Sequence, residues 1–105
     1  MTGGSDGIGL AMCHKLAKEG FNICIVARNE AKIEEKLEEI REECPNVSTL
    51  CIVADFDEMR SMQDYREKIG DRLKDYDVGI LVANAGVGLM GPFTWLEDKH
   101  VESIV

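Results

Sequence analysis

The chain has 105 residues, of which 45% are apolar and 30% are charged, and its formal net charge is −8 at pH 7. The length suits one small domain over residues 1–105, and the composition predicts a water-soluble globular protein. The excess of acidic residues argues against binding nucleic acid or an anionic membrane surface, because both need clustered Lys and Arg. No apolar run is long enough to be a membrane span.

The cysteines stand at positions 13, 24, 44 and 51, in apolar or helical stretches. None forms a Cys-x-x-Cys pair, and no His stands at metal-ligand spacing from them. We therefore expect buried free thiols and no metal site, as is typical of a chain in a reducing, cytosol-facing compartment.

A glycine-rich loop, MTGGSDGIGL, opens the chain and leads into an apolar stretch that predicts a helix over residues 8–19. Gly20 is placed to end that helix, because glycine readily adopts the left-handed backbone of a helix C-terminus. The following run, FNICIVA (21–27), is continuously apolar and predicts a strand buried on both faces.

A strongly charged helix is predicted next, with Asn29 as its N-cap and Pro45 just beyond its end. Its apolar residues recur at helical spacing: Ile33, Leu37, Ile40 and Cys44. The run TLCIVA (49–54) predicts a second buried strand.

A third helix and strand follow the same pattern. Asp57 is expected to cap the helix, and the run VGILVA (78–83) predicts the strand. The apolar stripe of the helix is Met62, Tyr65, Ile69 and Leu73. A further helix is expected over residues 95–105. Apolar strands that alternate with helices in this way predict an α/β fold with a doubly wound parallel sheet.

In such a sheet, a glycine-rich loop between a strand and a helix binds phosphate, because the helix N-terminus offers free N–H groups and partial positive charge. Gly3, Gly7 and Gly9 form the pattern T-G-x-x-x-G-x-G. This is neither G-x-G-x-x-G nor a P-loop, which would need G-K-[ST]. The alternative is that these glycines only allow tight packing between helix and strand.

Three motifs, in order along the chain, resemble those of the short-chain dehydrogenase/reductase family. TGGSDGIG resembles the cofactor loop, VADFD carries Asp55 at the end of the second predicted strand, and LVANAG carries Asn84 at the end of the third. The resemblance spans essentially the whole chain. It implies a Rossmann-type fold that binds a nicotinamide dinucleotide.

The resemblance also implies a role for each part of the site. The glycine loop would line the pyrophosphate and adenosine ribose, Asp55 would accept a hydrogen bond from the adenine amino group, and residues 84–86 would pass under the riboses. The cofactor-binding residues expected are Gly3, Ser5, Asp6, Gly7, Ile8, Gly9, Arg28, Asp55, Phe56, Asn84, Ala85 and Gly86. Alternatively, Asp55 is a turn or cap residue. Asn84 could also tie neighbouring strands together, a role that is compatible with cofactor binding. Ala83 departs from the family, which often has asparagine there.

The end of the first predicted strand, IVARN, favours NADP(H) over NAD(H). Ala27 stands where an acid would read a ribose 2′-hydroxyl, and Arg28 follows it. A carboxylate would repel a 2′-phosphate, whereas a guanidinium can bind it with two hydrogen bonds. Asp6 stands where some NADP-binding members have a basic residue, so Arg28 is the one positive anchor that we expect. The alternative is a solvated arginine at the strand end.

The catalytic Tyr-x-x-x-Lys of the family is not found, because Ile69 follows Tyr65 and Ile80 follows Tyr76 at that spacing. The family pattern also places a central strand before Thr2. We therefore expect a partial fold that lacks the first strand and the C-terminal half and has no catalytic residue of its own. Exposed strand edges would leave the isolated chain marginally stable or unfolded.

Within the family, SDGIG, EGFNICIVARN and DYDVGILVANAG most resemble the branch of 17-beta-hydroxysteroid dehydrogenases and very-long-chain 3-oxoacyl-CoA reductases. That branch implies reduction of a small carbonyl substrate, an acyl-CoA or a steroid, with NADPH. For the full-length protein it implies the endoplasmic reticulum membrane, and a homo-oligomer is open. One alternative is a non-catalytic dinucleotide-binding module or truncated relic. Another is a methyltransferase that uses S-adenosylmethionine, which would want a carboxylate in place of Ala27.

Overall fold

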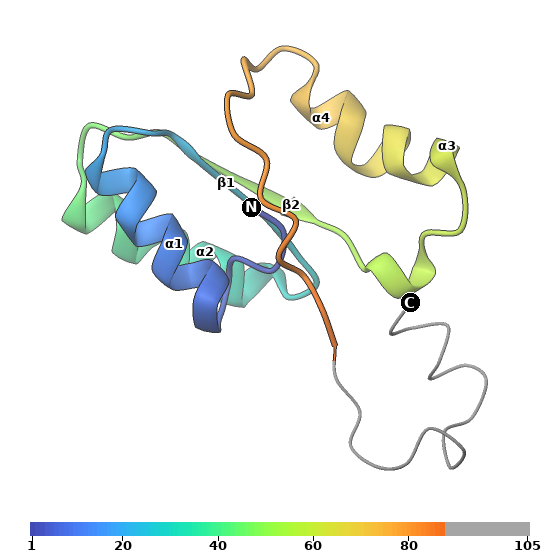
Figure 1. Ribbon diagram of the computed structural model, residues 1–105, viewed down its shortest axis with the longest axis horizontal. Helices are drawn as coiled ribbons and strands as arrows, with labels where there is room; N and C mark the ends of the chain where they lie inside the picture. Colours follow the sequence, from blue (N-terminus) through green and yellow to red (C-terminus); the bar gives the residue numbers. More distant parts are fainter. Residues whose placement is uncertain (88–105) are drawn as a thin grey trace.

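The computed structural model describes residues 1–87 and contains a parallel two-stranded sheet with helices on both faces (Figure 1). The strands are β1 (Ile23–Ala27) and β2 (Thr49–Val53), with Ile25 opposite Cys51. They are joined by α2 (Glu30–Glu43), as expected for parallel neighbours that need a helical crossover. The doubly wound α/β architecture is therefore as predicted. The helix predicted over 95–105 lies outside the described residues.

The first helix, α1 (Gly7–Lys18), begins and ends at local signals. Asp6 is its N-cap, and Gly20 follows its last turn with φ +92. Gly20 N–H donates to Ala17 O at 3.0 Å, and Phe21 N–H donates to Leu16 O at 3.1 Å. This pair of bonds is a Schellman motif, which needs a left-handed residue. The predicted stop at Gly20 is confirmed.

The second helix, α2, has the predicted cap and apolar stripe. Asn29 Oδ1 accepts the Lys32 N–H at 3.1 Å, and Ile33, Leu37 and Ile40 are fully buried. These side chains pack between α1 and one face of the sheet. The cluster on this face consists of Cys13, Ala17, Ile23, Ile25, Ile33, Leu37, Ile40 and Val47.

A smaller cluster covers the opposite face of the sheet and consists of Val26, Ile52, Ala54 and Met59. A short turn, η1 (Phe56–Glu58), precedes a helical run on this side. That run comprises α3 (Met62–Tyr65), the π turn η2 (Arg66–Gly70) and α4 (Asp71–Leu73). Ile69 and Leu73 pack against the cluster, but Met62 is 71% exposed, so the predicted stripe is right only in its second half.

The predicted cap at Asp57 is wrong. Ser61 caps α3 instead, in a capping box with Asp64: Ser61 Oγ accepts the Asp64 N–H at 3.3 Å, and Asp64 Oδ2 accepts the Ser61 N–H at 2.9 Å. Two reciprocal bonds satisfy two helix-end donors, whereas a cap at Asp57 would satisfy one. The intervening residues form η1, which Asp55 caps.

The third predicted strand (78–83) is not formed within the described residues. Residues 78–87 have no regular secondary structure, and their backbone hydrogen bond toward the sheet goes to Thr2. Thr2 pairs in parallel with Val26, and its N–H donates to Val82 O at 3.0 Å. A segment with a backbone hydrogen bond at a single residue does not form the series of bonds that defines a β-strand. Met1–Gly3 nevertheless links this segment to β1, because Met1 O accepts the Val26 N–H at 2.9 Å and Thr2 N–H donates to Val82 O.

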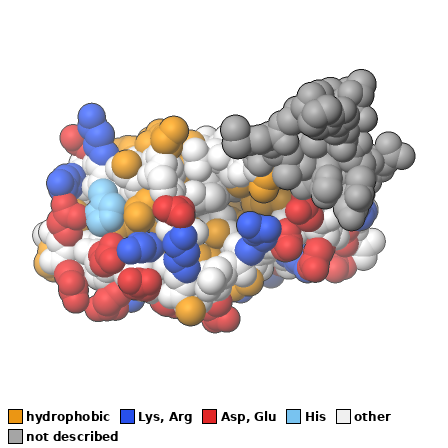
Figure 2. All heavy atoms as spheres, turned by 90° about the horizontal axis from the view of Figure 1, so that it is seen from below, with side chains coloured by type: hydrophobic (Ala, Val, Ile, Leu, Met, Phe, Trp, Pro, Cys, Tyr) orange, Lys and Arg blue, Asp and Glu red, His pale blue; other side chains and the backbone are white. Residues whose placement is uncertain are grey.

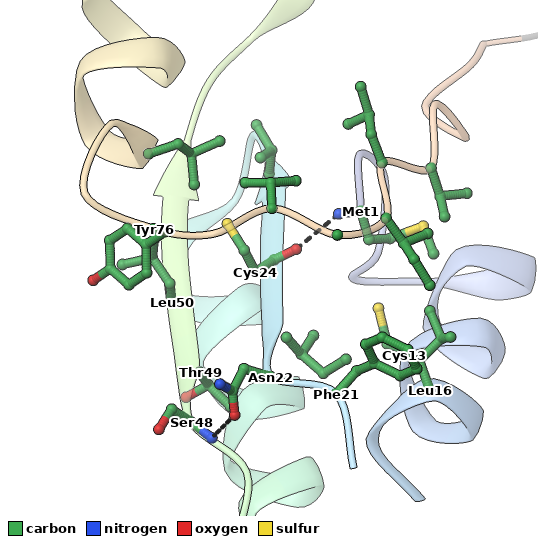
Figure 3. Close-up of a pocket in the computed structure, with 18 of the residues that line it drawn as sticks. Met1, Cys13, Leu16, Phe21, Asn22, Cys24, Ser48, Thr49, Leu50 and Tyr76 are labelled. Carbon is green, nitrogen blue, oxygen red and sulfur yellow. Dashed lines mark hydrogen bonds between the residues drawn. The ribbon is translucent and has the colours of Figure 1, made fainter. Parts of the chain in front are cut away.

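A cavity of about 540 Å³ lies between β1, the end of α1 and residues 76–82 (Figure 3). Residues 77–82 run across both strands in this view, toward Met1. The Met1 amino group donates to Cys24 O at 2.9 Å at one wall of the cavity. Phe21 and Leu16 lie on one side of it, and Tyr76 and Leu50 on the other. The edge of β1 that faces away from β2 thus borders this cavity at Ile23, while Met1–Gly3 is hydrogen-bonded to it at Cys24 and Val26.

All four cysteines are free thiols, as predicted. Cys13 is buried and the other three are half-buried. Burial raises the pKa of the Cys13 and Cys24 thiols, and burial together with the nearby Glu34 raises the pKa of Cys51 to about 11. These thiols therefore stay protonated at neutral pH. Over residues 1–87, no helix combines the length and apolar character needed to cross a bilayer.

Candidate nucleotide-binding site

The glycine loop leads directly into the N-terminus of α1. Gly3 and Gly7 have positive φ values, +65 and +52, which explains glycine at both positions. Asp6 Oδ1 accepts the Gly7 N–H at 2.8 Å. The N–H groups of Ile8 and Gly9 lie in the first helical turn and have no acceptor within the helix. Free donors and the helix dipole together make this loop suitable for an anion.

Two glycines allow the loop to touch the segment after residue 83. A Cβ on Gly9 would lie 2.4 Å from Asn84 Nδ2 and 2.5 Å from Gly3 O, and one on Gly3 would lie 2.9 Å from Ala85 Cα. No real Cβ approaches other atoms so closely. Gly7 differs, because nothing lies within 4 Å of its Cβ position. The alternative that the glycines serve packing therefore holds for Gly3 and Gly9, while Gly7 faces open space.

Thr2 and Asn84 connect the loop to residues 84–86. Thr2 Oγ1 accepts the N–H groups of Asn84 and Ala85, both at 3.0 Å. Asn84 Nδ2 donates to Thr2 O and Gly3 O, both at 3.2 Å. Asn84 thus ties the two segments together, a role that is compatible with a cofactor contact. Ala85 and Gly86 follow it on the exposed side of the loop. The sequence reasoning missed Thr2, whose hydroxyl has no local partner to reveal its role.

Arg28 is exposed at the carboxyl end of β1, in a shallow hollow that it shares with Asn29, Glu30 and Ala31. Gly3 N–H donates to Val26 O at 2.9 Å, so the loop and the end of β1 lie at the same edge of the sheet. The structure therefore brings Arg28 to the same side as the glycine loop. Ser5 is half-buried in this loop, and Ile8 is 76% exposed at its end.

Asp6 is paired with Lys32, a residue that the sequence reasoning missed. Lys32 Nζ lies 2.7 Å from Asp6 Oδ2. The Lys32 ammonium and the Gly7 N–H lower the pKa of the Asp6 carboxyl, with a further contribution from Lys36. Asp6 therefore remains ionised at neutral pH. The two residues are 26 positions apart, so no local pattern points to their contact.

Asp55 and Phe56 follow β2 at the same edge of the sheet. Asp55 Oδ1 accepts the Asp57 N–H at 3.0 Å and caps η1, so the alternative of a turn residue holds for it. The Phe56 ring stacks on Tyr65, with centroids 6.2 Å apart. One oxygen of the Asp55 carboxylate makes the turn, and a carboxylate has further acceptor positions. Over residues 1–87, no group of three or more His, Cys, Asp or Glu side chains could hold a metal ion.

A parallel sheet wound on both faces, with a glycine loop at the first helix, defines a Rossmann-type α/β protein. Residues 1–105 match the family described as short chain dehydrogenase. The chain belongs to the short-chain dehydrogenase family of oxidoreductases.

Relatives in this family are similar over nearly the whole chain. This chain is 36% identical over 107 residues to the very-long-chain 3-oxoacyl-CoA reductase of Coccidioides immitis (strain RS). The aligned region covers 100% of this chain and 30% of that protein. The short-chain dehydrogenase of Sphingobium yanoikuyae in complex with NADPH superposes with a TM-score of 0.85 at 28% identity, covering 99% of this chain and 39% of that one. A 7beta-hydroxysteroid dehydrogenase structure superposes with a TM-score of 0.83 at 26% identity, covering 98% and 38%. The chain thus spans about a third of the length of these relatives.

Proposed function

We propose that the chain is the cofactor-binding part of an NADP(H)-dependent carbonyl reductase. Its cofactor would lie along the carboxyl edge of the sheet, with the pyrophosphate at the Ile8 and Gly9 N–H groups and the adenosine between Arg28 and Asp55. Asn84, Ala85 and Gly86 would lie under the riboses. The bound nicotinamide would supply or accept the hydride. The observation that carries the proposal is the open face of Gly7 at a helix N-terminus whose donors are free.

Arg28 supports the choice of NADP(H). It stands at the end of β1 with Ala27 before it, so no carboxylate occupies the strand end itself. Glu30 is the acid nearest in the chain, and it lies in the first turn of α2, where the helix dipole favours it. The NADPH complex of the Sphingobium yanoikuyae relative supports the same cofactor class.

Replacing Arg28 with alanine tests the cofactor choice. The variant should bind NADPH roughly tenfold or more weakly, because it loses a charge-assisted hydrogen bond to the 2′-phosphate, and should bind NADH almost unchanged. Titration of the whole chain with each nucleotide, followed by fluorescence, measures both dissociation constants. Arg66→Ala is the matched control, because Arg66 lies on η2 over the other face of the sheet. An equal loss for both nucleotides in Arg28→Ala would contradict the proposal.

The substrate is proposed to be a 3-oxoacyl-CoA or a steroid ketone, which the names of two relatives support. No tyrosine here is followed by lysine at the fourth position: Tyr65 stacks on Phe56, and Tyr76 is exposed. We therefore assign no catalytic residue. The second candidate is a dinucleotide-binding module without turnover. Binding of NADPH with no loss of its absorbance at 340 nm on addition of a 3-oxoacyl-CoA would favour that candidate for the chain alone.

A further inference from the structure

An ion pair joins the glycine loop to the first turn of α2. Lys32 Nζ lies 2.7 Å from Asp6 Oδ2, while Asp6 Oδ1 accepts the Gly7 N–H at 2.8 Å. One carboxylate therefore contacts both the start of α1 and a side chain of α2. This arrangement holds the Lys32 ammonium beside the N-terminus of α1.

The turn that carries Lys32 follows directly after the end of β1. Lys32 is four residues beyond Arg28 and in the first turn of α2, where its backbone N–H donates to Asn29 Oδ1 at 3.1 Å. Two cationic residues, Arg28 before α2 and Lys32 in its first turn, thus lie at the edge of the sheet where the glycine loop lies. Two acids, Asp6 and Glu30, are also present there. Without Lys32, the Asp6 carboxylate would have no cationic partner so close and would repel a phosphate.

The ion pair leaves Lys32 able to bind a second anion. An ammonium has three N–H donors, and the contact with Asp6 uses one of them. The Lys32 side chain is 39% exposed, so its other donors can reach a ligand from solvent. A phosphate monoester carries close to two negative charges at neutral pH and is bound best by more than one cation. Arg28 alone would leave part of that charge uncompensated.

We propose that Lys32 is the second cationic group that binds the 2′-phosphate of NADP(H), and that Asp6 is the positioning residue that holds its ammonium beside the glycine loop. This inference rests on the proposed function. It explains how the site can accept a 2′-phosphate with an acid at position 6.

The ratio of the NADH and NADPH dissociation constants, measured on the whole chain, tests this role. Lys32→Met should lower the preference for NADPH roughly tenfold or more, because a hydrogen bond between charged groups is lost, and Lys32→Arg should retain most of it. Lys36→Met is the matched control: it removes the same charge one turn along α2, from a lysine whose Nζ lies 2.9 Å from Glu39 Oε1. The control should change the ratio less than about twofold. Lys32→Gln replaces Lys32→Met if circular dichroism shows that the latter is unfolded.

Measuring Lys32→Met in an Asp6→Asn background distinguishes direct binding of the 2′-phosphate by Lys32 from mere neutralisation of the Asp6 carboxylate. If Lys32 contacts the phosphate, Lys32→Met must also lower the NADPH preference in Asp6→Asn, by a smaller factor than in the wild-type chain because Asp6 no longer holds the ammonium. Complete loss of the effect in Asp6→Asn would overturn the inference. A wild-type chain that prefers NADPH, with an unchanged ratio in Lys32→Met, would overturn this inference alone. A wild-type chain with no preference for NADPH would overturn the proposed cofactor and this inference with it.

Discussion

At the scale of single residues, Thr2 is the side chain on which the site most depends. Its hydroxyl accepts two backbone N–H groups, from Asn84 and Ala85, and its own N–H and hydroxyl reach Val82 O. Thr2→Val keeps the shape but leaves both donors without their acceptor. We expect the free energy of unfolding in urea to fall by about 1–2 kcal/mol, because one of the two lost hydrogen bonds is part-buried and the other is exposed.

Thr2→Ser is the control for this prediction, because it keeps the hydroxyl and loses one methyl group. It should be less destabilising than Thr2→Val, even though it removes more apolar surface. The opposite order would mean that the methyl group, and not the hydroxyl, holds residues 84–85 against the loop.

At the scale of elements, local signals predicted the helix ends well and the long-range pairing poorly. Gly20 and Asn29 act on backbone groups within four residues, so their roles could be predicted from the sequence alone. The capping box of Ser61 and Asp64 is equally local, because its Ser-x-x-Asp spacing lies within one helical turn. The strand predicted over 78–83 failed because a strand needs a neighbouring backbone, and apolar composition says nothing about which backbone is adjacent.

The site shows the same division. The glycine loop and the end of β1 carry recognisable residues at fixed spacing, so Gly7 and Arg28 could be identified from the sequence. Lys32 and Thr2 could not, because each acts on a partner that is distant in the chain. Contacts of this kind form only when β1 and α2 pack beside α1. They leave no mark on the sequence pattern within each element, so that pattern cannot predict them.

The C-terminal ends of α1 and α2 are joined by charges that make stability depend on pH. Glu43 Oε1 lies 2.7 Å from Lys18 Nζ, and Glu43 Oε2 lies 2.7 Å from His14 Nδ1. Figure 2 shows the histidine of this face among acidic and basic side chains. Hydrogen bonds from Lys18 and His14 lower the pKa of the Glu43 carboxyl in the folded chain. This contribution to stability is present above the unfolded-state pKa and is lost as the pH falls through the folded one.

Glu43→Gln should therefore destabilise the chain near neutral pH and make its stability less sensitive to acid. Urea unfolding at several values between about pH 7 and pH 3 measures the difference between the two proteins, which should shrink as the pH falls below about 4.5. The lowered pKa values of Asp6 and Asp64 act equally in both proteins and cancel in the comparison. Because the pair is exposed, high salt should also reduce the difference. A difference that is constant with pH would show that Glu43 acts through packing.

At the scale of the whole molecule, the two faces of the sheet are unequally covered. The cluster beneath α1 and α2 contains Ile25, Ile33, Leu37 and Ile40, each with at most 1% of its surface exposed. The helical run over 62–73 on the other face has no fully buried residue of its own, and the backbone of 78–87 is hydrogen-bonded to Thr2 and not to a strand. Burial of apolar surface is the main source of stability, so the first face should hold most of it.

Native-state hydrogen exchange should reveal this inequality. Amides of β1 and α2 should exchange slowest, through opening of the whole cluster, whereas amides over 62–73 should exchange at least about tenfold faster, through a local opening that leaves the first face intact. Leu37→Ala should accelerate exchange in both regions, because loss of a fully buried leucine costs about 2–5 kcal/mol and weakens the cluster on which the sheet depends. Leu73→Ala, its counterpart on the other face, should accelerate exchange over 62–73 alone. Equal protection in the two regions, or equal effects of the two substitutions, would mean that both faces of the sheet open together as one cooperative unit.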